Sequence, residues 1–208
     1  MKRIILLLAT AIAAITAARA DETSESILRH LADRLAEYGN YEVRFTVSSE
    51  GMGTVKGSYI VSGDRYRIKI QRNEQFSDGV NRYEIYPTDK EVVIDVADTD
   101  SHDLLSNPTR AFEFAPEEFD STYKGPASFK RRSVETVLLS PREGEYGTGT
   151  ITLYLDAGDG WPVALEYGFE GDGFTVTIER ITRLEEPDPS LFMFDPAAYA
   201  DYEVIDFR

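Results

Sequence analysis

The amino-acid sequence predicts a mainly β (α+β) protein. We expect a curved antiparallel sheet that forms an incomplete β-barrel, with an N-terminal helix and a small helical lid over a hydrophobic cavity. Three observations lead to this prediction. Residues 23–39 repeat apolar side chains at helical spacing, apolar and polar side chains alternate through most of the chain after Tyr41, and residues 98–126 interrupt that alternation. About nine or ten strands joined by short turns favour antiparallel neighbours and a sheet that curls.

The first twenty residues have the pattern of an export signal. Two basic residues, Lys2 and Arg3, precede an almost wholly apolar run, and Ala18-Arg19-Ala20 then has the small-x-small form of a cleavage site. We therefore predict a cleavable signal peptide at residues 1–20, followed by a single domain at residues 21–208. The alternative is a retained signal anchor, although the apolar run is short for a membrane span.

The chain has no cysteine. Export would allow disulfides, but a chain without cysteine cannot form them. The absence also rules out a lipid-modified cysteine after the signal, a thiol nucleophile and a cysteine zinc site. We expect a mature protein that is soluble and not lipid-anchored.

The formal net charge of the whole chain is −15. Three of its 22 basic residues lie in the predicted signal peptide, so the mature chain would carry 37 acidic residues against 19 basic ones, a net charge of −18. Such a chain is repelled by phosphate backbones and by anionic lipid surfaces. We expect no nucleic-acid partner and no permanent electrostatic attachment to a membrane.

Residues 23–39 predict one amphipathic helix. Thr23 or Ser24 is a suitable N-cap, and Gly39 suits the left-handed residue that ends a helix. One stripe of the helix is apolar, and it consists of Ile27, Leu31, Leu35 and Tyr38. A helix of this kind needs a sheet or another helix to cover.

The strands of the first half are indicated by alternation and by turn residues. The runs 41–47, 55–61 and 66–70 alternate cleanly, and Gly57 stands where the second run would carry another side chain. Asp78-Gly79 lies between two further alternating runs. We interpret it as a turn and not as part of a catalytic or metal site, because it has no histidine, cysteine or ordered acidic partner nearby in sequence.

The interruption after residue 98 is rich in leucine and phenylalanine. Asp98 to Ser101 could cap a short helix, and Asn107-Pro108 stops it; Pro108 suits the first turn of a second short helix. An irregular region follows up to Gly125-Pro126. We expect later strands at residues 129–140, 149–156, 162–170 and 173–183, then a short helical turn and a last extended piece at 202–205.

The residues offer little catalytic or metal-binding chemistry. The two histidines, His30 and His102, have no second histidine at ligand spacing, and no G-x-S-x-G elbow or helix-opening glycine-rich loop occurs. An acidic cluster follows one strand and consists of Asp95, Asp98, Asp100 and Asp103. It lacks the central glycine and closing glutamate of a calcium loop. We expect no catalytic residue, no metal site, no cofactor and no enzymatic activity.

The unusual feature is apolar. The chain has 12 tyrosines, 11 phenylalanines and one tryptophan, many of them on the inward face of predicted strands. Plain core packing explains each residue singly, whereas a curved apolar sheet under a Leu/Phe segment is suited to holding an apolar ligand. The side chains expected to line the cavity are Val43, Phe45, Tyr59, Val61, Tyr66, Ile68, Tyr83, Ile85 and Ile94. Those expected to act as the lid are Leu104, Leu105, Phe112 and Phe114.

The order of these parts resembles that of the outer-membrane lipoprotein carrier family, the LolA-like proteins, over about residues 22–208. The resemblance lies in a series of segments: YEVRFTVSS, GSYIVSGDRYRIKI, FSDGVNRYEIYPTDKEVVI, HDLLSNPTRAF, LDAGDGWPVALEYGFEGDG, DPSLFMFDP and the closing YEVIDFR. It implies an incomplete β-barrel with a helical lid over a hydrophobic cavity.

The resemblance also implies a function and its partners. The protein would be a soluble, monomeric periplasmic carrier, and its cargo would be an acylated lipoprotein or another lipid. Its partners would be an inner-membrane lipoprotein-releasing transporter and an outer-membrane receptor. A periplasmic glycolipid-binding or sensor module on the same fold is the alternative, and a secreted hydrolase is a third. The sequence departs from the family at the cavity mouth. Family members carry an arginine just after the second strand, where this chain has Ser62-Gly63-Asp64, followed by an Arg65 that alternates outward.

Overall fold

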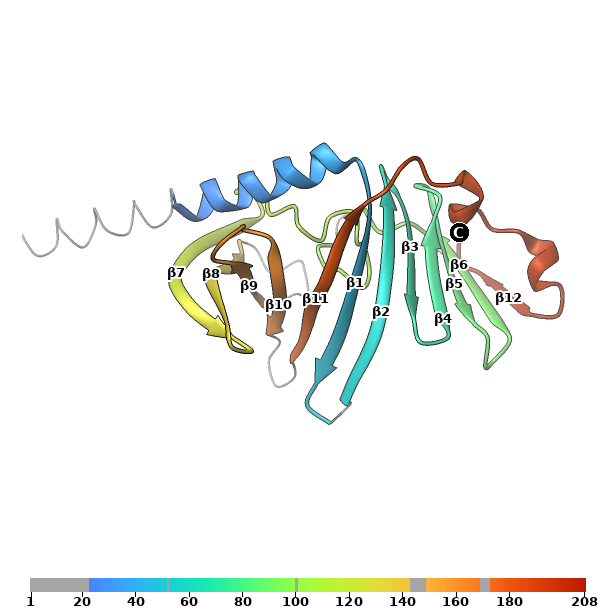
Figure 1. Ribbon diagram of the computed structural model, residues 1–208. Helices are drawn as coiled ribbons and strands as arrows, with labels where there is room; N and C mark the ends of the chain where they lie inside the picture. Colours follow the sequence, from blue (N-terminus) through green and yellow to red (C-terminus); the bar gives the residue numbers. More distant parts are fainter. Residues whose placement is uncertain (1–22, 52, 100, 143–148, 169–172) are drawn as a thin grey trace, which may run out of the picture.

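The computed structural model describes residues 23–51, 53–99, 101–142, 149–168 and 173–208 (Figure 1). The predicted signal peptide lies outside the described residues. So do residues 143–148, which include the end of one predicted turn, and residues 169–172, which include the end of the predicted strand 162–170 and part of the turn after it. Residues 23–38 form the predicted N-terminal helix. It ends at Gly39, whose φ of +66° and whose N–H bonds to Leu35 and Ala36 carbonyls are those of a left-handed helix end. No helix in the described ranges is long and apolar enough to cross a membrane.

The rest of the described chain is mainly strand. The strands are β1 (Asn40–Ser49), β2 (Gly53–Ser62), β3 (Arg65–Ile70), β4 (Asn73–Ser77), β5 (Asn81–Tyr86), β6 (Glu91–Val96), β7 (Phe119–Phe129), β8 (Arg132–Pro141), β9 (Thr150–Asp156), β10 (Pro162–Gly168), β11 (Gly173–Arg183) and β12 (Glu203–Asp206). Two short 3₁₀ helices, η1 (Pro189–Phe192) and η2 (Pro196–Tyr199), precede β12.

These strands form one 12-stranded sheet in the order β12-β6-β5-β4-β3-β2-β1-β11-β10-β9-β8-β7. The sheet curves but does not close, because β12 and β7 are its two free edges (Figure 1). This confirms the predicted incomplete barrel. The paired strands are antiparallel as expected, except that β12 runs parallel to β6. One strand, β7, was not predicted as such.

One face of the sheet carries the main apolar core, and we call it the helix face. Val43 on β1 pairs with Tyr59 on β2, which pairs with Ile68 on β3, so these side chains share that face. Leu28, Leu31 and other buried residues of the helix pack against them. The further buried members from the sheet include Phe45, Val61, Tyr66, Val137, Leu139, Ile151, Leu153, Leu165, Tyr167, Val176 and Ile178.

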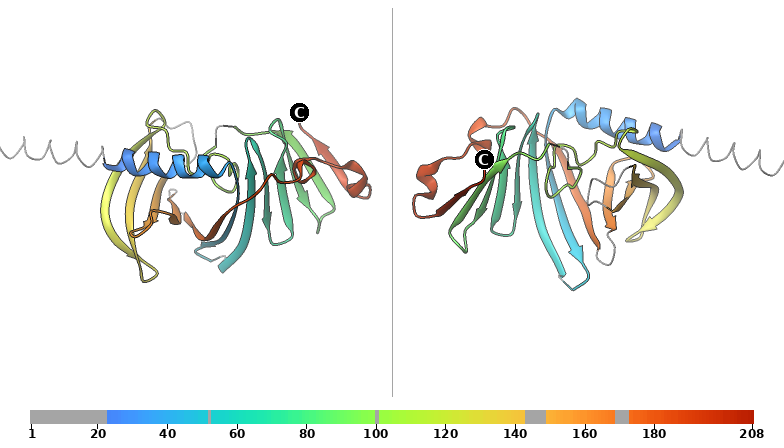
Figure 2. Two further views of the ribbon diagram at one scale, coloured as in Figure 1. Left: turned by 45° about the horizontal axis from the view of Figure 1, so that its top comes forward. Right: turned by 180° about the vertical axis from the view of Figure 1, so that it is seen from behind.

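The opposite face is covered over β3 to β6 by the C-terminal segment, and we call it the tail face. The segment leaves β11 and crosses the strands to reach β12 (Figure 2, left). Phe192 is fully buried, the Arg67 guanidinium donates to the Leu191 carbonyl at 3.1 Å, and Phe194 stacks on Tyr83 with ring centroids 5.2 Å apart. A second buried cluster results, and it consists of Phe76, Tyr83, Ile85, Val92 and Ile94.

The segment between β6 and β7 is not helical, contrary to the prediction. Its described residues form turns, such as the one closed by the Asn107 N–H on the Asp103 carbonyl at 2.8 Å. Side chains supply the physical reason. The carboxylate of Asp103 accepts from the Leu105 N–H at 2.9 Å, and Asn107 accepts from the Thr109 N–H at 3.3 Å. Such local bonds compete with helix formation, and Pro108 has no N–H to continue it.

The turn at Asp78-Gly79 is confirmed. One carboxylate oxygen of Asp78 accepts from the N–H groups of Val80 and Asn81 at 2.9 and 2.8 Å, and Gly79 has a φ of +96°. These bonds outweigh the effect of burial and lower the pKa of Asp78 below its ordinary value. The aspartate is therefore engaged in holding the β4–β5 turn.

Gly57 gives a testable prediction about the core. It pairs with Phe45, and a Cβ at Gly57 would lie 2.6 Å from the tip of that fully buried ring and 3.1 Å from the Lys69 carbonyl oxygen. We expect Gly57→Ala to lower the free energy of unfolding by about 1–3 kcal/mol through overpacking. Urea denaturation measures this effect. Combining Gly57→Ala with Phe45→Leu should recover part of the loss, and strict additivity of the two changes would contradict the steric explanation.

Candidate functional site

Residues 97–99 and 101–118 cross the helix face from β6 to the far edge strand β7, and we call them the covering segment (Figure 2, right). Their apolar side chains point into the core. Leu104 is 0% exposed, Phe112 3% and Phe114 8%, and Leu105 is half-buried against the same cluster. The four residues predicted as a lid therefore all pack on the apolar face of the sheet. Their action as a moving lid stays a prediction.

The structure brings together six of the nine residues predicted to line the cavity. Those on the helix face are Val43, Phe45, Tyr59, Val61, Tyr66 and Ile68, each at most 4% exposed. Tyr83, Ile85 and Ile94 lie instead on the tail face, in the second cluster. The register explains the separation, because Ile68 pairs with Gln75 and Gln75 with Glu84, so the helix face becomes polar at β4 and β5. Period-two alternation shows that one face is apolar but not which face it is.

The remaining wall of this apolar surface comes from β8 to β11, which the sequence reasoning did not assign to the site. It includes Val137, Leu139, Ile151, Leu153, Leu165, Tyr167, Val176 and Ile178. The signal was present in the clean alternation at residues 151–155 and 174–178. Only the pairing of β1 with β11 shows that these strands continue the surface begun by β1 to β3.

Two tyrosine hydroxyls hold the middle of the covering segment from either side. The Tyr66 hydroxyl donates to the Ser106 carbonyl at 3.1 Å, and the Gln75 amide donates to the same oxygen at 2.9 Å. Across the face, the Tyr167 hydroxyl accepts from the Leu104 N–H at 3.2 Å. These are hydrogen bonds from side chains to a backbone that makes no strand or helix, so the segment is attached at points and not along a ladder.

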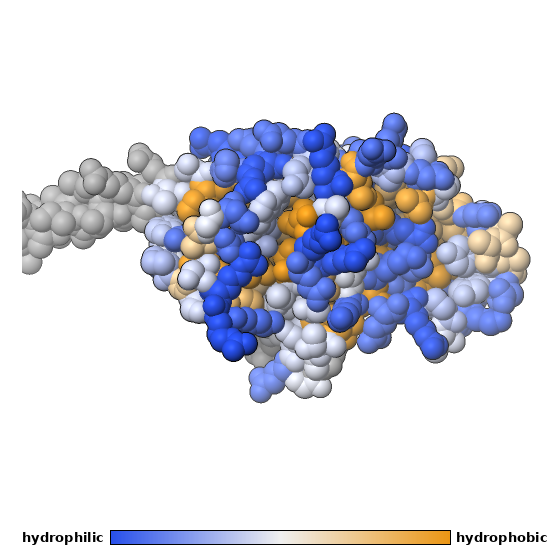
Figure 3. All heavy atoms as spheres, in the orientation of Figure 1, coloured by the Kyte–Doolittle hydropathy of each residue, from blue (hydrophilic) through white to orange (hydrophobic). Residues whose placement is uncertain are grey.

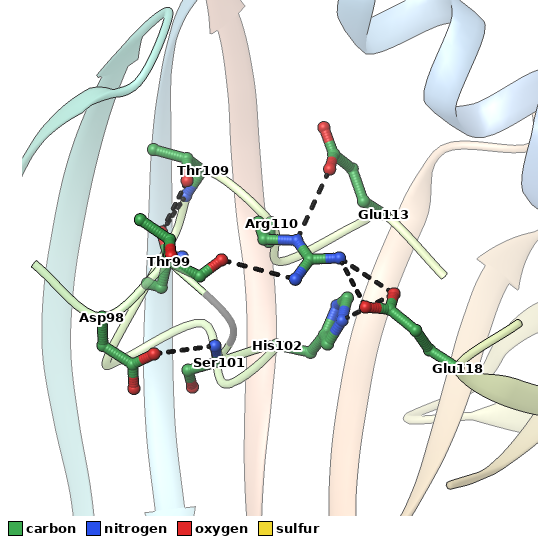
Figure 4. A network of polar contacts seen from close by, with 9 residues as sticks. Asp98, Thr99, Ser101, His102, Thr109, Arg110, Glu113 and Glu118 are labelled. Carbon is green, nitrogen blue, oxygen red and sulfur yellow. Dashed lines mark hydrogen bonds and ion pairs between the residues drawn. The ribbon is translucent and has the colours of Figure 1, made fainter. Parts of the chain in front are cut away.

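A charged network ties the end of the covering segment to its start (Figure 4). Arg110 donates to both carboxylate oxygens of Glu118 at 2.9 Å, donates to the Thr99 carbonyl at 3.3 Å and lies 3.8 Å from Glu113. The Nε2 of His102 lies 3.0 Å from Glu118. One Arg110 nitrogen thus contacts both oxygens of Glu118, and this ion pair adjoins a buried imidazole. Hydrogen bonds between ionised groups are among the strong ones.

His102 is 3% exposed and packs between Phe114 and Phe119, with ring centroids 6.4 and 4.9 Å away. Burial, followed by the charge of Arg110, lowers the pKa of His102 below its ordinary value, although Glu118 acts in the opposite direction. Burial alone would raise the pKa of Glu118, but the hydrogen bond from Arg110 outweighs it and lowers that pKa. The network therefore holds a neutral imidazole beside an ionised carboxylate.

Several cavities lie along the margins of the covering segment. An apolar one of about 270 Å³ lies between the helix and β7 and is bordered by Leu28, Phe114 and Phe119. One of about 150 Å³ lies between Leu35, Tyr41 and Phe112, and a more polar one of about 380 Å³ lies beside Tyr66 and Arg110. The two apolar cavities are below the range of about 300–1,000 Å³ usual for ligand sites. The apolar face is thus filled by the chain's own residues.

The polar side chains that the sequence analysis singled out lie apart in the described residues. No set of three or more His, Cys, Asp or Glu side chains in these ranges could hold a metal ion. His30 is exposed on the helix, and Asp103 is occupied by the Leu105 N–H and the Ser106 hydroxyl. Asp100 of the acidic cluster lies outside the described residues.

Arg65 lies on the tail face, as its alternation with Tyr66 predicts. Its guanidinium donates to the Ser62 hydroxyl at 3.2 Å and lies 5.1 Å from the centre of the Phe192 ring. The family arginine at the cavity mouth therefore has no counterpart at this position of the chain. Arg110 is the basic residue that borders the polar cavity instead, and it is bound to Glu118.

The lowered pKa of His102 gives a prediction about pH. Because the unfolded chain binds this proton more readily than the folded one, the free energy of unfolding falls as pH drops through about 6.5, the ordinary histidine pKa. We expect His102→Gln to flatten this decline in urea denaturation between pH 7.5 and pH 5.5. Glu118 titrates below this window because its pKa is lowered.

His30→Gln is the matched control, because it removes an exposed imidazole from the helix. We expect that variant to keep the wild-type decline. If His102→Gln kept the full decline as well, His102 would not be the group responsible. The comparison uses the change in stability with pH, so a lower absolute stability of His102→Gln does not affect it.

Comparison with known proteins gives similarity of structure only. No protein-family model matches the sequence, and no curated protein matches it. Among solved structures, an uncharacterized conserved protein from Thermus thermophilus superposes with a TM-score of 0.60 at 10% identity, over 89% of this chain and 99% of the other.

Two further structures are similar over nearly their whole length. A putative outer membrane lipoprotein-sorting protein domain from Vibrio parahaemolyticus has a TM-score of 0.52 at 11% identity, covering 83% of this chain and 97% of that one. A DUF1329 family protein from Desulfovibrio piger has a TM-score of 0.51 at 9% identity, covering 84% and 97%. At these identities the likeness concerns the fold alone. The chain therefore shares the fold of this lipoprotein-sorting protein domain, which agrees with the fold that the sequence resemblance implied.

Proposed function

We propose that this protein is a soluble periplasmic carrier that shelters the acyl chains of lipoproteins in a hydrophobic cavity and ferries them from the inner to the outer membrane. It would act without catalysis, as a monomer, after export by its cleavable signal peptide. An inner-membrane lipoprotein-releasing transporter would load it, and an outer-membrane receptor would accept its cargo. The fold shared with a lipoprotein-sorting domain supports the cargo class.

One observation carries the proposal: the apolar inner face of an open half-barrel is covered by a segment without helix or strand. The described part of the covering segment is attached by buried side chains and by a few polar contacts. An element with few backbone bonds to its neighbours can leave more readily than a strand of the sheet. Withdrawal of the segment would expose the six aligned helix-face residues as a cavity floor.

Magnitudes support an exchange between segment and cargo. Burial of a large apolar side chain contributes about 1.5–3 kcal/mol, so Leu104, Phe112 and Phe114 together contribute roughly 5–9 kcal/mol. A buried methylene contributes about 0.8 kcal/mol, so one palmitoyl chain offers about 12 kcal/mol. The two quantities are of the same order. Acyl cargo could thus replace the covering segment without a large energetic gap in either direction, which a reversible carrier requires.

The surface of the protein is consistent with a freely diffusing carrier. Figure 3 shows hydrophilic side chains over most of the visible face, with apolar residues exposed in separate patches. The formal charge of −15 for the whole chain repels anionic lipid head groups. A carrier of this kind would approach a membrane protein without adsorbing to the bilayer itself.

The direct test is to identify what the protein carries. Protein purified from its native envelope fraction is extracted with organic solvent, and the extract and the protein are both analysed by mass spectrometry. We expect an acylated amino-terminal peptide or an intact acylated lipoprotein in stoichiometric amount. A glycolipid in its place would favour the alternative binding or sensor module, and turnover that one Asp→Asn change abolishes would contradict the absence of catalysis.

The covering segment gives a second prediction. If it competes with cargo, Phe112→Ala should weaken the closed state and tighten the binding of an apolar ligand, by roughly tenfold or more, because more molecules are then binding-competent. Titration with a palmitoyl lipid monitored by dye displacement measures this. Unchanged or weaker binding would contradict the assignment of the segment as a lid.

Phe76→Ala is the matched control. Phe76 is as deeply buried as Phe112, at 2% against 3% exposed, but it belongs to the cluster on the tail face. We expect it to lower stability by a similar amount and to leave ligand affinity unchanged. Equal gains in affinity for both variants would show that general loosening of the fold, and not release of the segment, explains the effect.

A further inference from the structure

The hydroxyl of Tyr59 is buried without a hydrogen-bond partner in the described part of the chain. Tyr59 is 1% exposed and lies in the middle of the helix face, paired with Val43 on one side and Ile68 on the other. Its ring packs against Tyr41 and Phe45, with ring centroids 6.4 and 5.9 Å away. Phenylalanine would fill the same space and leave no donor unsatisfied. The hydroxyl therefore contributes nothing to the closed structure.

Other tyrosine hydroxyls surround this group. Burial raises the pKa of Tyr59 well above its ordinary value, and the hydroxyls of Tyr41 and Tyr167 raise it further. The hydroxyl of Tyr167 is also buried, and it accepts the Leu104 N–H of the covering segment. On the other side, the Tyr66 hydroxyl donates to the Ser106 carbonyl. The phenol without a partner thus lies in the same buried surface as two phenols that bind the covering segment.

Withdrawal of the covering segment would change the state of these groups. Tyr66 and Tyr167 would lose their bonds to the segment, and Tyr59 would keep a free donor. An apolar cavity would then hold up to three phenol donors among aliphatic side chains. A hydrocarbon chain satisfies none of them, whereas a carbonyl oxygen accepts one or two hydrogen bonds. Burial of an ester carbonyl in an apolar cavity also needs a donor, because an unpaired polar group is costly to bury.

We propose that Tyr59 is a binding residue for the carbonyl oxygen of ester- or amide-linked acyl chains, with Tyr66 and Tyr167 as further donors once the covering segment has left. This inference rests on the proposed carrier function and specifies its ligand class. The site selects acyl groups, in which a carbonyl joins the chain to its head group, over alkyl chains attached by ether bonds. The aliphatic side chains around the tyrosines supply affinity, and the phenols supply the selection.

The test compares two lipids that differ only at the linkage. 1-Palmitoyl-lysophosphatidylcholine has an ester carbonyl, and 1-O-hexadecyl-lysophosphatidylcholine lacks it. Both are titrated below their micelle concentrations into the full-length mature protein, with displacement of an apolar fluorescent dye as the signal. We expect wild type to prefer the ester by roughly three- to tenfold, the value of one hydrogen bond. Tyr59→Phe should lose most of that preference by weakening ester binding alone.

Two controls separate a binding role from a structural one. Tyr154→Phe removes a hydroxyl that bonds Glu166 at 2.8 Å on the opposite face of the sheet, and it should keep the ester preference. The thermal midpoint of Tyr59→Phe should equal or exceed that of wild type, because the hydroxyl has no partner to lose. A lower midpoint with equal weakening of both lipids would overturn the inference.

The remaining outcomes are also decisive. Equal affinity of wild type for ester and ether, unaltered in Tyr59→Phe, would overturn the carbonyl site and leave the carrier function intact. Failure of both lipids to bind wild type and Phe112→Ala alike would overturn the carrier function, and the carbonyl site with it.

Discussion

The connection from β6 to β7 has to cross the sheet, and the rest of the structure depends on this constraint. β6 lies one strand from one edge, and β7 forms the other edge. In an open sheet with an apolar inner face, the connecting chain must either run around the outside or lie across that face. Here it lies across the face and carries leucine and phenylalanine, so one stretch of chain both completes the topology and buries the core. A closed barrel would need no such segment.

Each face of the sheet has apolar side chains that another part of the chain covers, and the two covers are attached to the sheet in different ways. On the tail face, the C-terminal segment ends as a strand, and the backbone bonds of β12 to β6 anchor it next to the stacked rings of Tyr83 and Phe194. On the helix face, the described part of the covering segment has no ladder, and its backbone meets the sheet through the side chains of Tyr66, Gln75 and Tyr167. A permanent cover would be expected to pair with the sheet through backbone hydrogen bonds, as the C-terminal segment does through β12. The contrast within one molecule is therefore the strongest structural reason to regard the covering segment as removable.

Much of the fold follows from local sequence. Helical spacing before Gly39, alternation in β1 to β3 and the Asp78-Gly79 turn were all predicted and are confirmed, because each depends on neighbours within a few residues. β7 was missed because Gly125-Pro126 favours a loop. In the structure a register irregularity occurs between Tyr123 and Gly125, and Pro126 lies on an edge strand where a missing N–H is tolerated.

The site is less predictable, for a reason that lies in the pairing of strands. Tyr83 and Ile85 alternate as regularly as Tyr66 and Ile68, yet the two pairs lie on opposite faces. The difference is set by β4, whose Gln75 takes the inward position and whose Phe76 faces outward. Short turns on both sides of β4, two residues before it and three after it, fix that register, and no property of Tyr83 itself reports it. The short helices expected near Leu104 and Phe112 fail likewise, because side-chain bonds from Asp103 and Asn107 decide the local backbone.

Departures from good packing collect where the covering segment meets the sheet. The Tyr59 hydroxyl is a buried donor without a partner in the described residues, which reduces the stability of the closed state. The His102 imidazole is buried between two phenylalanine rings, where its pKa is lowered. Natural sequences break such rules mainly at functional sites and compensate elsewhere. The compensation here is the extensive apolar core, to which β1, β2 and β8 to β11 contribute together with the segment. A cover attached to a large apolar core by a few polar contacts is the arrangement on which the proposed reversible exchange of an apolar cargo depends.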